Sequence, residues 1–530
     1  MKAGGPRPVS RQNAVGANAF EINVIQEAEA AAALTRRSGC NHVALGRKWL
    51  DGVFGKHSRN QVERSISGIK VKYIPGMRNQ IGKGSWWRWV AVSVLLGAFM
   101  PLPWAVPQTP TPAPPLKQAP DVATAPPRAA PARISAYTLP PELYRKAHRL
   151  YQTRFAIRVI STFYGIFVFW LLLQAKWAAR FRDWAERVTS KRFVQVLIFT
   201  PLLVLAVWLL QFPLDLFSQW LLKRYGISVQ SWGSWFGDWG KSFLLTVLFG
   251  SLLVWLLYVI IRRSAERWWL YFWIISLPLL LLIMFASPYV IDPLFNKYEP
   301  LASKAPQLIP KLQELTRRAG QEIPVERMFW MNASDKTIGT NASVNGFGAS
   351  KRIIIWDTTL AQETDDEVLA DFGHEMGHYV LGHLVKGFFF FAAVLFVLFY
   401  LGKQSIGWLL ARQGSRWGVR GVEDLASLPA LLLLVSVFGI VATVIGNSFS
   451  RYMENQADVY GLEVTHGIVP EPGQACARSF QKFGETVFVE PNPNPMDVLV
   501  FFDHPPVRDR IHLCVTYDPW SKGETPQFVK

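Results

Sequence analysis

Six long stretches of this chain contain no charged residue, and they limit the possible folds more than any other feature. They cover residues 159–173, 193–214, 242–261, 268–291, 387–402 and 425–446. Most of them approach the roughly 20 apolar residues that a helix needs to cross a bilayer. Arg, Lys and Trp gather at their ends, as they do at membrane interfaces. We therefore predict six transmembrane helices; buried helices of a large soluble protein are the alternative, and the flanking residues argue against it.

The chain before the first of these stretches divides into three parts. Residues 1–76 show no sustained periodicity, and we expect them to be a disordered upstream extension with the natural start at Met77. Residues 77–106 combine a basic start with an apolar run of 11 residues, Val90–Met100, which indicates a signal peptide or, equally, an uncleaved signal anchor. Residues 107–141 are rich in Pro, Ala and Thr, so they form a linker that cannot build a core.

The stretch Thr364–Lys386 contains the sequence His-Glu-Met-Gly-His at residues 374–378. Thr364 is followed by three acidic residues, which is typical of a capping box at the start of a helix. Residues four apart share one face of a helix, so His374 and His378 can bind one metal ion while Glu375 reaches a water molecule. This is the pattern of a zinc hydrolase, but a chance match is the alternative until a third ligand is found.

The best candidate for a third ligand is Glu454, which follows the sixth apolar stretch. Two His and one carboxylate leave the fourth zinc position to water, as hydrolysis requires. Asp458, one turn later, can accept the free N–H of a ligand histidine. An ordinary solvated acidic pair is the alternative. Two spans separate the histidines from Glu454, and an even number of crossings returns the chain to the same side, so the ligands can meet.

A substrate-binding segment is predicted before residues 351–356. Asn345, Gly346 and Phe347 precede this expected strand, and an edge strand beside the zinc helix could pair with an extended substrate. By spacing alone, a loop followed by a core strand is the alternative. Other elements expected here are a helix at Leu308–Ala319 and a strand at Val325–Met331.

Near the C-terminus, His504 and Arg510 lie beside two prolines and could stabilise an oxyanion. Taken alone, this string could equally be a turn and a helix start with solvated charges. His383 and His512 are expected to be structural.

The net charge of +18 does not indicate nucleic-acid binding. Residues 1–85 hold 14 Lys and Arg against 5 acids, which accounts for +9, and the remaining excess flanks the membrane stretches. We therefore expect no nucleic-acid partner.

Three cysteines, Cys40, Cys476 and Cys514, are too few for a disulfide scaffold or a cysteine zinc site. Cys476 and Cys514 could pair only if their domain faces an oxidising compartment. Two unrelated buried thiols are the alternative.

Taken in order, these motifs resemble the CAAX prenyl endopeptidase family of membrane-embedded zinc metalloproteases, of the gluzincin type. The likeness runs from about Glu142 to the C-terminus. It rests on the segments 292–297, 344–348, 351–353, 374–378 and 454–458, and on His504-Pro505 with Arg510. The series is specific because several short motifs recur in one order.

The resemblance implies a polytopic helical membrane protein with a mainly α zinc-metalloprotease domain that carries a small β-sheet. Residues 142–291 would hold four membrane helices, and residues 292–530 the peptidase domain with the spans 387–402 and 425–446. It implies one Zn²⁺ per chain and a polypeptide substrate that is lipid-modified or associated with the membrane. The implied roles are metal ligands for His374, His378 and Glu454, general base for Glu375, a second-shell carboxylate for Asp458, substrate binding for Asn345, Gly346 and Phe347, and assistance at the reacting centre for His504 and Arg510.

The chain departs from the family pattern at its start, where a signal-like segment and a Pro-rich linker replace the usual first span. The short signal and loops are typical of a bacterial protein, so we expect a bacterial inner-membrane enzyme that acts on envelope or membrane-associated polypeptides. A catalytically silent zinc-binding scaffold is the alternative function. A transporter is a weaker one, because the apolar stretches offer no charged residue for a translocation path.

The distribution of basic residues predicts the orientation in the membrane. The loops 176–192, 262–267 and 403–424 carry 6, 3 and 4 Lys or Arg, whereas the short alternate loop 213–241 carries 3. The first set should be cytoplasmic, which puts the active site on the periplasmic face. The basic cluster at residues 145–158 argues for the opposite orientation.

Overall fold

The computed structural model describes residues 133–346 and 351–529. They belong to a compact unit that spans residues 84–530. The predicted extension 1–76, the signal-like segment 77–106 and most of the linker 107–141 lie outside the described residues.

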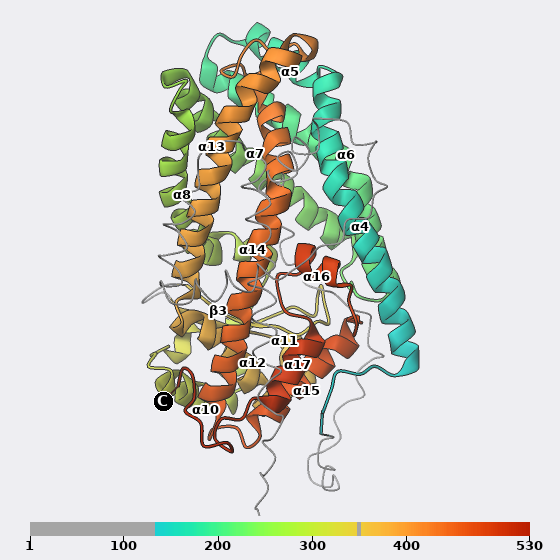
Figure 1. The fold of residues 1–530 in the computed structure, drawn as a ribbon, viewed down its shortest axis with the longest axis vertical. Helices are drawn as coiled ribbons and strands as arrows, with labels where there is room; N and C mark the ends of the chain where they lie inside the picture. Colours follow the sequence, from blue (N-terminus) through green and yellow to red (C-terminus); the bar gives the residue numbers. More distant parts are fainter. Residues whose placement is uncertain (1–132, 347–350, 530) are drawn as a thin grey trace, which may run out of the picture. The chain divides into compact units, whose positions relative to one another are not determined.

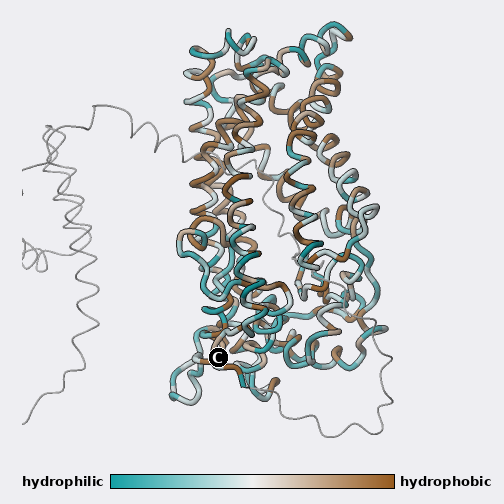
Figure 2. Tube along the Cα trace, turned by 90° about the vertical axis from the view of Figure 1, so that its right-hand side faces the viewer, coloured by the Kyte–Doolittle hydropathy of each residue, from teal (hydrophilic) through white to brown (hydrophobic). Residues whose placement is uncertain are grey.

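Six helices in the described part of the chain are long and apolar enough to cross a membrane, as predicted. They are α4 (Pro141–Gln174), α6 (Arg192–Arg224), α7 (Trp232–Arg263), α8 (Trp268–Val290), α13 (His383–Trp417) and α14 (Leu428–Thr465). Each contains one of the six uncharged stretches or most of it. The helices run side by side (Figure 1), and their long middle parts are mainly hydrophobic whereas hydrophilic residues gather at the two ends (Figure 2). The sequence pattern therefore predicted the membrane part of the fold correctly.

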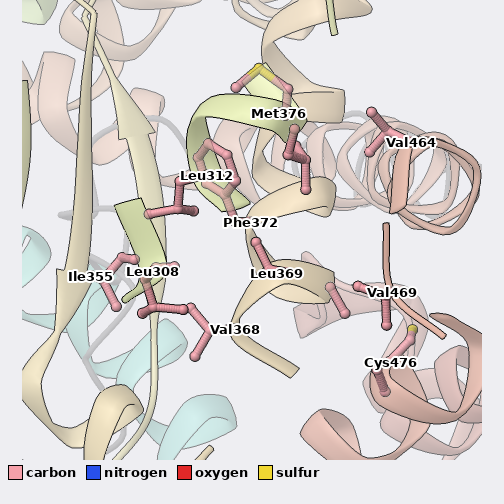
Figure 3. Close-up of a cluster of buried hydrophobic side chains, with 14 of the residues drawn as sticks. Leu308, Leu312, Ile355, Val368, Leu369, Phe372, Met376, Val464, Val469 and Cys476 are labelled. Carbon is pink, nitrogen blue, oxygen red and sulfur yellow. The ribbon is translucent and has the colours of Figure 1, made fainter. Parts of the chain in front are cut away.

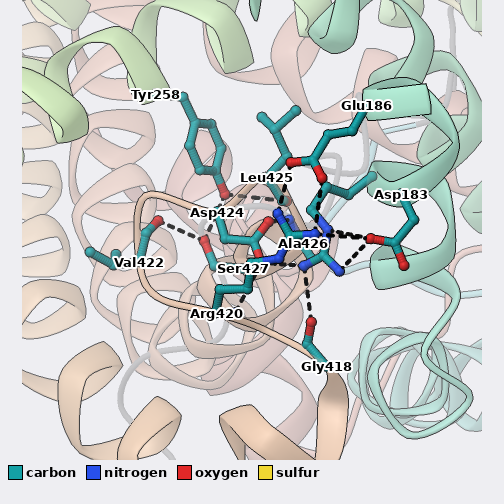
Figure 4. Close-up of polar contacts among 11 residues, drawn as sticks. Asp183, Glu186, Tyr258, Gly418, Arg420, Val422, Asp424, Leu425, Ala426 and Ser427 are labelled. Atoms are coloured by element: carbon teal, nitrogen blue, oxygen red, sulfur yellow. Dashed lines mark hydrogen bonds and ion pairs between the residues drawn. The ribbon is translucent and has the colours of Figure 1, made fainter. Parts of the chain in front are cut away.

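A polar cluster joins the helices at the end of this unit that lies far from α12 (Figure 1). Arg182 of the short helix α5 (Trp177–Val188) pairs with the buried Asp424, which caps the 3-10 turn η4 (Leu425–Ser427). Arg420 pairs with Glu186 of α5 at 2.9 Å (Figure 4). Buried charges need such partners because a lone charge is costly away from water. The cluster thus fixes α5 against the loop that connects α13 and α14.

At the other end, a four-stranded sheet has the strand order β1-β2-β4-β3. The strands are β1 (Tyr298–Pro300), β2 (Met328–Met331), β3 (Ala342–Asn345) and β4 (Arg352–Trp356). β2 and β4 are parallel, and the outer strands are antiparallel to their neighbours. The strand that follows Asn345 is β4, which lies inside the sheet. Both of its edges are therefore paired, and the edge strands of the sheet in the described residues are β1 and β3.

Among the described residues, seven short helices surround the sheet, in addition to the ends of the long helices α13 and α14. They are α9 (Asp292–Phe295), α10 (Leu308–Arg318), α11 (Asp357–Gln362), α12 (Asp365–Val380), α15 (Pro472–Thr486), α16 (Pro495–Phe501) and α17 (Val507–Thr516), with the 3-10 turns η1 (Leu301–Ser303) and η2 (Val325–Arg327). The expected helix at Leu308–Ala319 is present. The expected strand at Val325–Met331 is shorter, because its first residues form η2.

One apolar core holds this domain together around α12. Phe372 and Met376 are fully buried, and they face Leu312 of α10 and Val464 at the end of α14 (Figure 3). Full burial of a side chain of this size contributes about 1.5–3 kcal/mol. Because α10, α12 and α14 share the core, the position of the histidines on α12 is set by apolar packing on its other face.

The predicted helix Thr364–Lys386 is in fact two helices. The capping box at its start is present, with Thr364 and Glu367 each bonded to the other's backbone N–H. α12 then ends at Val380, and Gly382 adopts the left-handed conformation with φ of +68° before α13 begins at His383. Glycine takes this conformation at little cost, whereas residues with a side chain do not. The break turns the chain from the soluble domain into the membrane.

Candidate metal centre

Three side chains from two helices converge on one point. His374 and His378 lie one turn apart on α12, and Glu454 reaches them from α14, so one ligand atom of each lies within 4.8 Å of the others. The two Nε2 atoms are 3.1 Å apart. Each of them lies 3.3 Å from an oxygen of Glu454. The two intervening membrane crossings therefore do return the chain to the histidines.

Small residues allow α12 and α14 to approach so closely. A Cβ atom added to Gly461 would lie 2.8 Å from the backbone N of His374. One added to Gly377 would lie 3.1 Å from the backbone of Ala457. Real Cβ atoms essentially never come closer than 3.0 Å to such atoms. The close crossing thus requires glycine at residue 461, and a Cβ at residue 377 would be tightly packed against α14.

The three donors fit a zinc ion. Zinc lies about 2.0–2.2 Å from His nitrogen and carboxylate oxygen in a tetrahedral site, which separates neighbouring donors by about 3.3–3.6 Å. Here the two Nε2 atoms are 3.1 Å apart, and each lies 3.3 Å from a different oxygen of Glu454. Glu454 Oε2 is also buried and accepts no hydrogen bond from a described residue. A cation between the three side chains would satisfy that oxygen, so the chemistry of the donors agrees with their spacing.

His374 is oriented by charged partners behind it. Its Nδ1 lies 2.8 Å from Asp458 Oδ1, so Nδ1–H donates to the carboxylate and Nε2 points to the centre. Arg510 of α17 donates to both oxygens of Asp458, at 2.9 Å from Nε and 2.5 Å from Nη2. Burial lowers the pKa of His374, but Asp458 and Glu454 outweigh it and raise this pKa to about 10. A bound metal would displace that proton.

Glu375 follows His374 on α12 and is the candidate general base. It makes no hydrogen bond or ion pair with another residue in the described part of the chain. Burial raises the pKa of its carboxyl above the ordinary value of 4.5, against the opposing effect of His374 and His378. Its carboxylate is therefore free to accept a proton from a water molecule at the centre.

His504 lies beside the carboxylate of the candidate ligand Glu454. Its Nε2 is 3.3 Å from Glu454 Oε1, and its Nδ1 is 2.9 Å from Asp503. The loop between α16 and α17 thus brings His504 to the centre, and α17 brings Arg510. The two residues do meet at one site, although the sequence alone left a turn with solvated charges as an alternative.

The edge strand β3 lies along the sheet on the side of α12, and Asn345 is its last residue. Among the described residues, β3 pairs only with β4. Gly346 follows with φ of +92°. Phe347 lies outside the described residues.

Sequence reasoning did not predict the contact that His383 makes. It was expected to be structural, and its Nδ1 lies 3.0 Å from Nδ1 of the candidate ligand His378. Five residues separate the two histidines, which on one continuous helix places them on different faces. Only the turn at Gly382 brings them together. No signal in the sequence marks this contact.

Cys476 of α15 and Cys514 of α17 form a disulfide bond in the structure. The alternative of two unrelated thiols is therefore not what the fold adopts. The bond joins the helix of Arg510 to α15, whose Arg478 and Lys482 both pair with Glu367 at the start of α12. The disulfide and the two ion pairs thus connect α17 and α12 through α15.

Comparison with known proteins gives two adjacent family matches. Residues 123–297 match the family described as CAAX prenyl protease N-terminal, five membrane helices, and residues 302–515 match peptidase family M48. Within residues 133–297, the structure has four membrane-capable helices. This agrees with the departure from the family pattern at the start of the chain.

Several curated proteins are similar over most of their length. The chain is 37% identical over 346 residues to the uncharacterized metalloprotease YhfN of Bacillus subtilis, covering 65% of this chain and 79% of that protein. It is 28% identical over 318 residues to the CAAX prenyl protease 1 homolog of Oryza sativa subsp. japonica, covering 59% and 71%. The crystal structure of S. mikatae Ste24p has a similar fold, with a TM-score of 0.62 at 22% identity, over 72% of this chain and 90% of that one.

Proposed function

This chain belongs to peptidase family M48 and is an integral membrane metalloendopeptidase, and we propose that its metal is one zinc ion held by His374, His378 and Glu454. The observation that carries the proposal is the convergence of the three side chains: the two Nε2 atoms lie 3.1 Å apart, and each lies 3.3 Å from one of the two oxygens of Glu454. These distances are close to the edge of a zinc tetrahedron. The fourth position is left for water, as in other hydrolytic zinc sites.

The reaction is hydrolysis of a peptide bond. Zinc, when bound, lowers the pKa of a water molecule and polarises the scissile carbonyl. Glu375 accepts the proton of that water and later delivers it to the leaving nitrogen. Asp458, held by Arg510, keeps His374 in the tautomer that presents Nε2. His504 adds a polar group beside Glu454, where it can stabilise charge that develops on the carbonyl oxygen.

The substrate is a polypeptide that is associated with the membrane or carries a lipid. Asn345 and Gly346 end the free edge of the sheet, and a substrate in extended conformation would add to β3 through backbone hydrogen bonds. The centre lies on α12, just before α13 enters the membrane part, and on the segment of α14 that has left it, so the scissile bond must come close to the bilayer.

The active site faces the periplasm of a bacterial inner membrane. Two of the three loops at the far end from α12 carry more Lys and Arg, 6 and 4, than the loop 213–241, which carries 3, and this favours a cytoplasmic far end. The disulfide between Cys476 and Cys514 supports an oxidising compartment on the side of the centre. Mass spectrometry of native membranes should find this pair oxidised; free thiols at both positions would contradict the assignment.

The test is zinc content and peptide cleavage by the purified protein in detergent. The peptide library includes unmodified and lipidated members, so that an enzyme that cleaves only lipidated peptides is also detected. Wild type should bind one zinc and cleave. Glu375→Gln should keep its zinc and lose about 10²–10⁴-fold in rate. Glu454→Ala should lose the zinc.

Glu314→Gln is the matched control, because Glu314 is an exposed acid on α10 whose only ion pair is with Arg317 on the same helix. It should leave both zinc content and rate unchanged. Wild-type protein without zinc, or Glu375→Gln with the wild-type rate, would contradict the proposal. Zinc binding without cleavage of any peptide would instead favour a silent scaffold.

A further inference from the structure

His383 is a buried histidine at a junction between the soluble and the membrane part. It is the first residue of α13 and only 3% exposed. Gly382, with φ of +68°, reverses the chain just before it. This turn folds His383 back onto α12, so that its ring meets the ring of His378 nearly edge to face, with centroids 5.0 Å apart.

The hydrogen bonds around His383 can run in one direction only. If His378 presents Nε2 to the metal, its Nδ1 carries the proton and donates. His383 Nδ1, 3.0 Å away, must then accept. The proton of His383 therefore sits on Nε2, which lies 3.3 Å from the amide oxygen of Gln456. Gln456 in turn donates from its amide nitrogen to Tyr452 at 3.1 Å.

Every member of this chain of contacts has a partner of the correct type. Gln456 offers an oxygen to His383 and a nitrogen to Tyr452, so the amide is used at both ends. Reversing the chain would put two N–H groups or two lone pairs against each other. The arrangement thus selects one tautomer for each of the two rings.

We propose that His383 is a positioning residue for the metal ligand His378, acting as the acceptor that holds this ring with Nε2 directed at the metal. The inference rests on the proposed zinc site. The two ligand histidines then have different hydrogen-bond partners. His374 donates to the carboxylate of Asp458, which Arg510 holds, and His378 donates to the neutral imidazole of His383, which Gln456 holds. The alternative is that His383 only fills space in the core.

The experiment compares three substitutions at this position in the purified full chain. The oxygen of Asn lies as many bonds from the backbone as Nδ1 of His, so His383→Asn keeps an acceptor for His378. His383→Gln places its oxygen nearer to the position of Nε2, and His383→Leu has no acceptor. Zinc affinity is measured by competition with a chelator, and the absorption spectrum of the cobalt-substituted protein reports the ligand geometry.

The Gln and Leu variants should bind zinc about 10–100-fold more weakly and change the cobalt spectrum, whereas Asn should stay closer to wild type. His512→Leu, at an exposed position on α17, is the control and should match wild type. If His383→Leu does not fold, the zinc affinities of His383→Asn and His383→Gln are compared to test the proposal. Equal zinc affinity in all folded variants would overturn the proposal, and so would a loss in Asn equal to that in Gln. A wild-type protein that binds no zinc would refute the proposed function instead.

Discussion

Substituting Gly461 by Ala should weaken the metal centre although it replaces none of the candidate metal ligands. Gly461 lies at the crossing of α14 with α12, on the same helix as Glu454. Its added Cβ would lie 2.8 Å from the backbone N, and 3.1 Å from the Cα, of His374. Both are backbone atoms of a packed helix, so no flexible side chain can move aside.

The size of the effect follows from these distances. Restoring an ordinary contact of 3.4 Å requires the two helices to separate by about 0.6 Å at this point. Metal sites tolerate about 0.2 Å in ligand position, so His374 and Glu454 would no longer fit one zinc ion. We expect a stability loss of about 1–3 kcal/mol from overpacking. Zinc affinity should fall at least about tenfold, which equals about 1.4 kcal/mol.

The assay is thermal unfolding in detergent, with and without zinc, together with chelator competition. Gly407→Ala is the control, because Gly407 lies inside α13 and nothing is within 4 Å of its added Cβ. Ala there should be neutral or stabilising by about 0.5–1 kcal/mol. If Gly461→Ala binds zinc as tightly as wild type and unfolds at the same temperature, the close crossing does not set the geometry of the centre.

Two further predictions concern the helices around the centre. Burial raises the pKa of Glu367, but Lys482 and the Thr364 backbone N–H outweigh it, so the folded pKa is below the ordinary 4.5. Its ionised form therefore stabilises the fold above about pH 4.5, and this effect is lost as the pH falls further. The difference in free energy of unfolding between wild type and Glu367→Gln should therefore shrink in acid. A difference that does not change with pH would refute this. Breaking the Cys476–Cys514 bond, which links residues 38 apart, should cost about 3–4 kcal/mol. Chemical reduction and Cys476→Ser should lower the unfolding temperature alike, and an unchanged temperature would show that the bond does not form.

The membrane helices and the pattern of the helix that carries the two histidines could be predicted from local sequence patterns. A bilayer offers backbone groups no water to bond with, so a long uncharged stretch has few structures open to it besides a helix. The histidine spacing and the capping box are likewise local, since they depend on one turn of one helix. Parity of the spans then predicted that Glu454 could return to the histidines, and the fold agrees.

How these parts meet could not be predicted from the sequence. The approach of α14 to α12 depends on Gly461 lying against the backbone of His374, a contact between residues 87 positions apart. β3 is an edge strand, because β4 inserts between β2 and β3. His383 reaches His378 through a turn that helical periodicity does not foresee. Periodicity describes one element at a time, whereas these contacts arise from packing between elements, which the order of residues along one helix does not record.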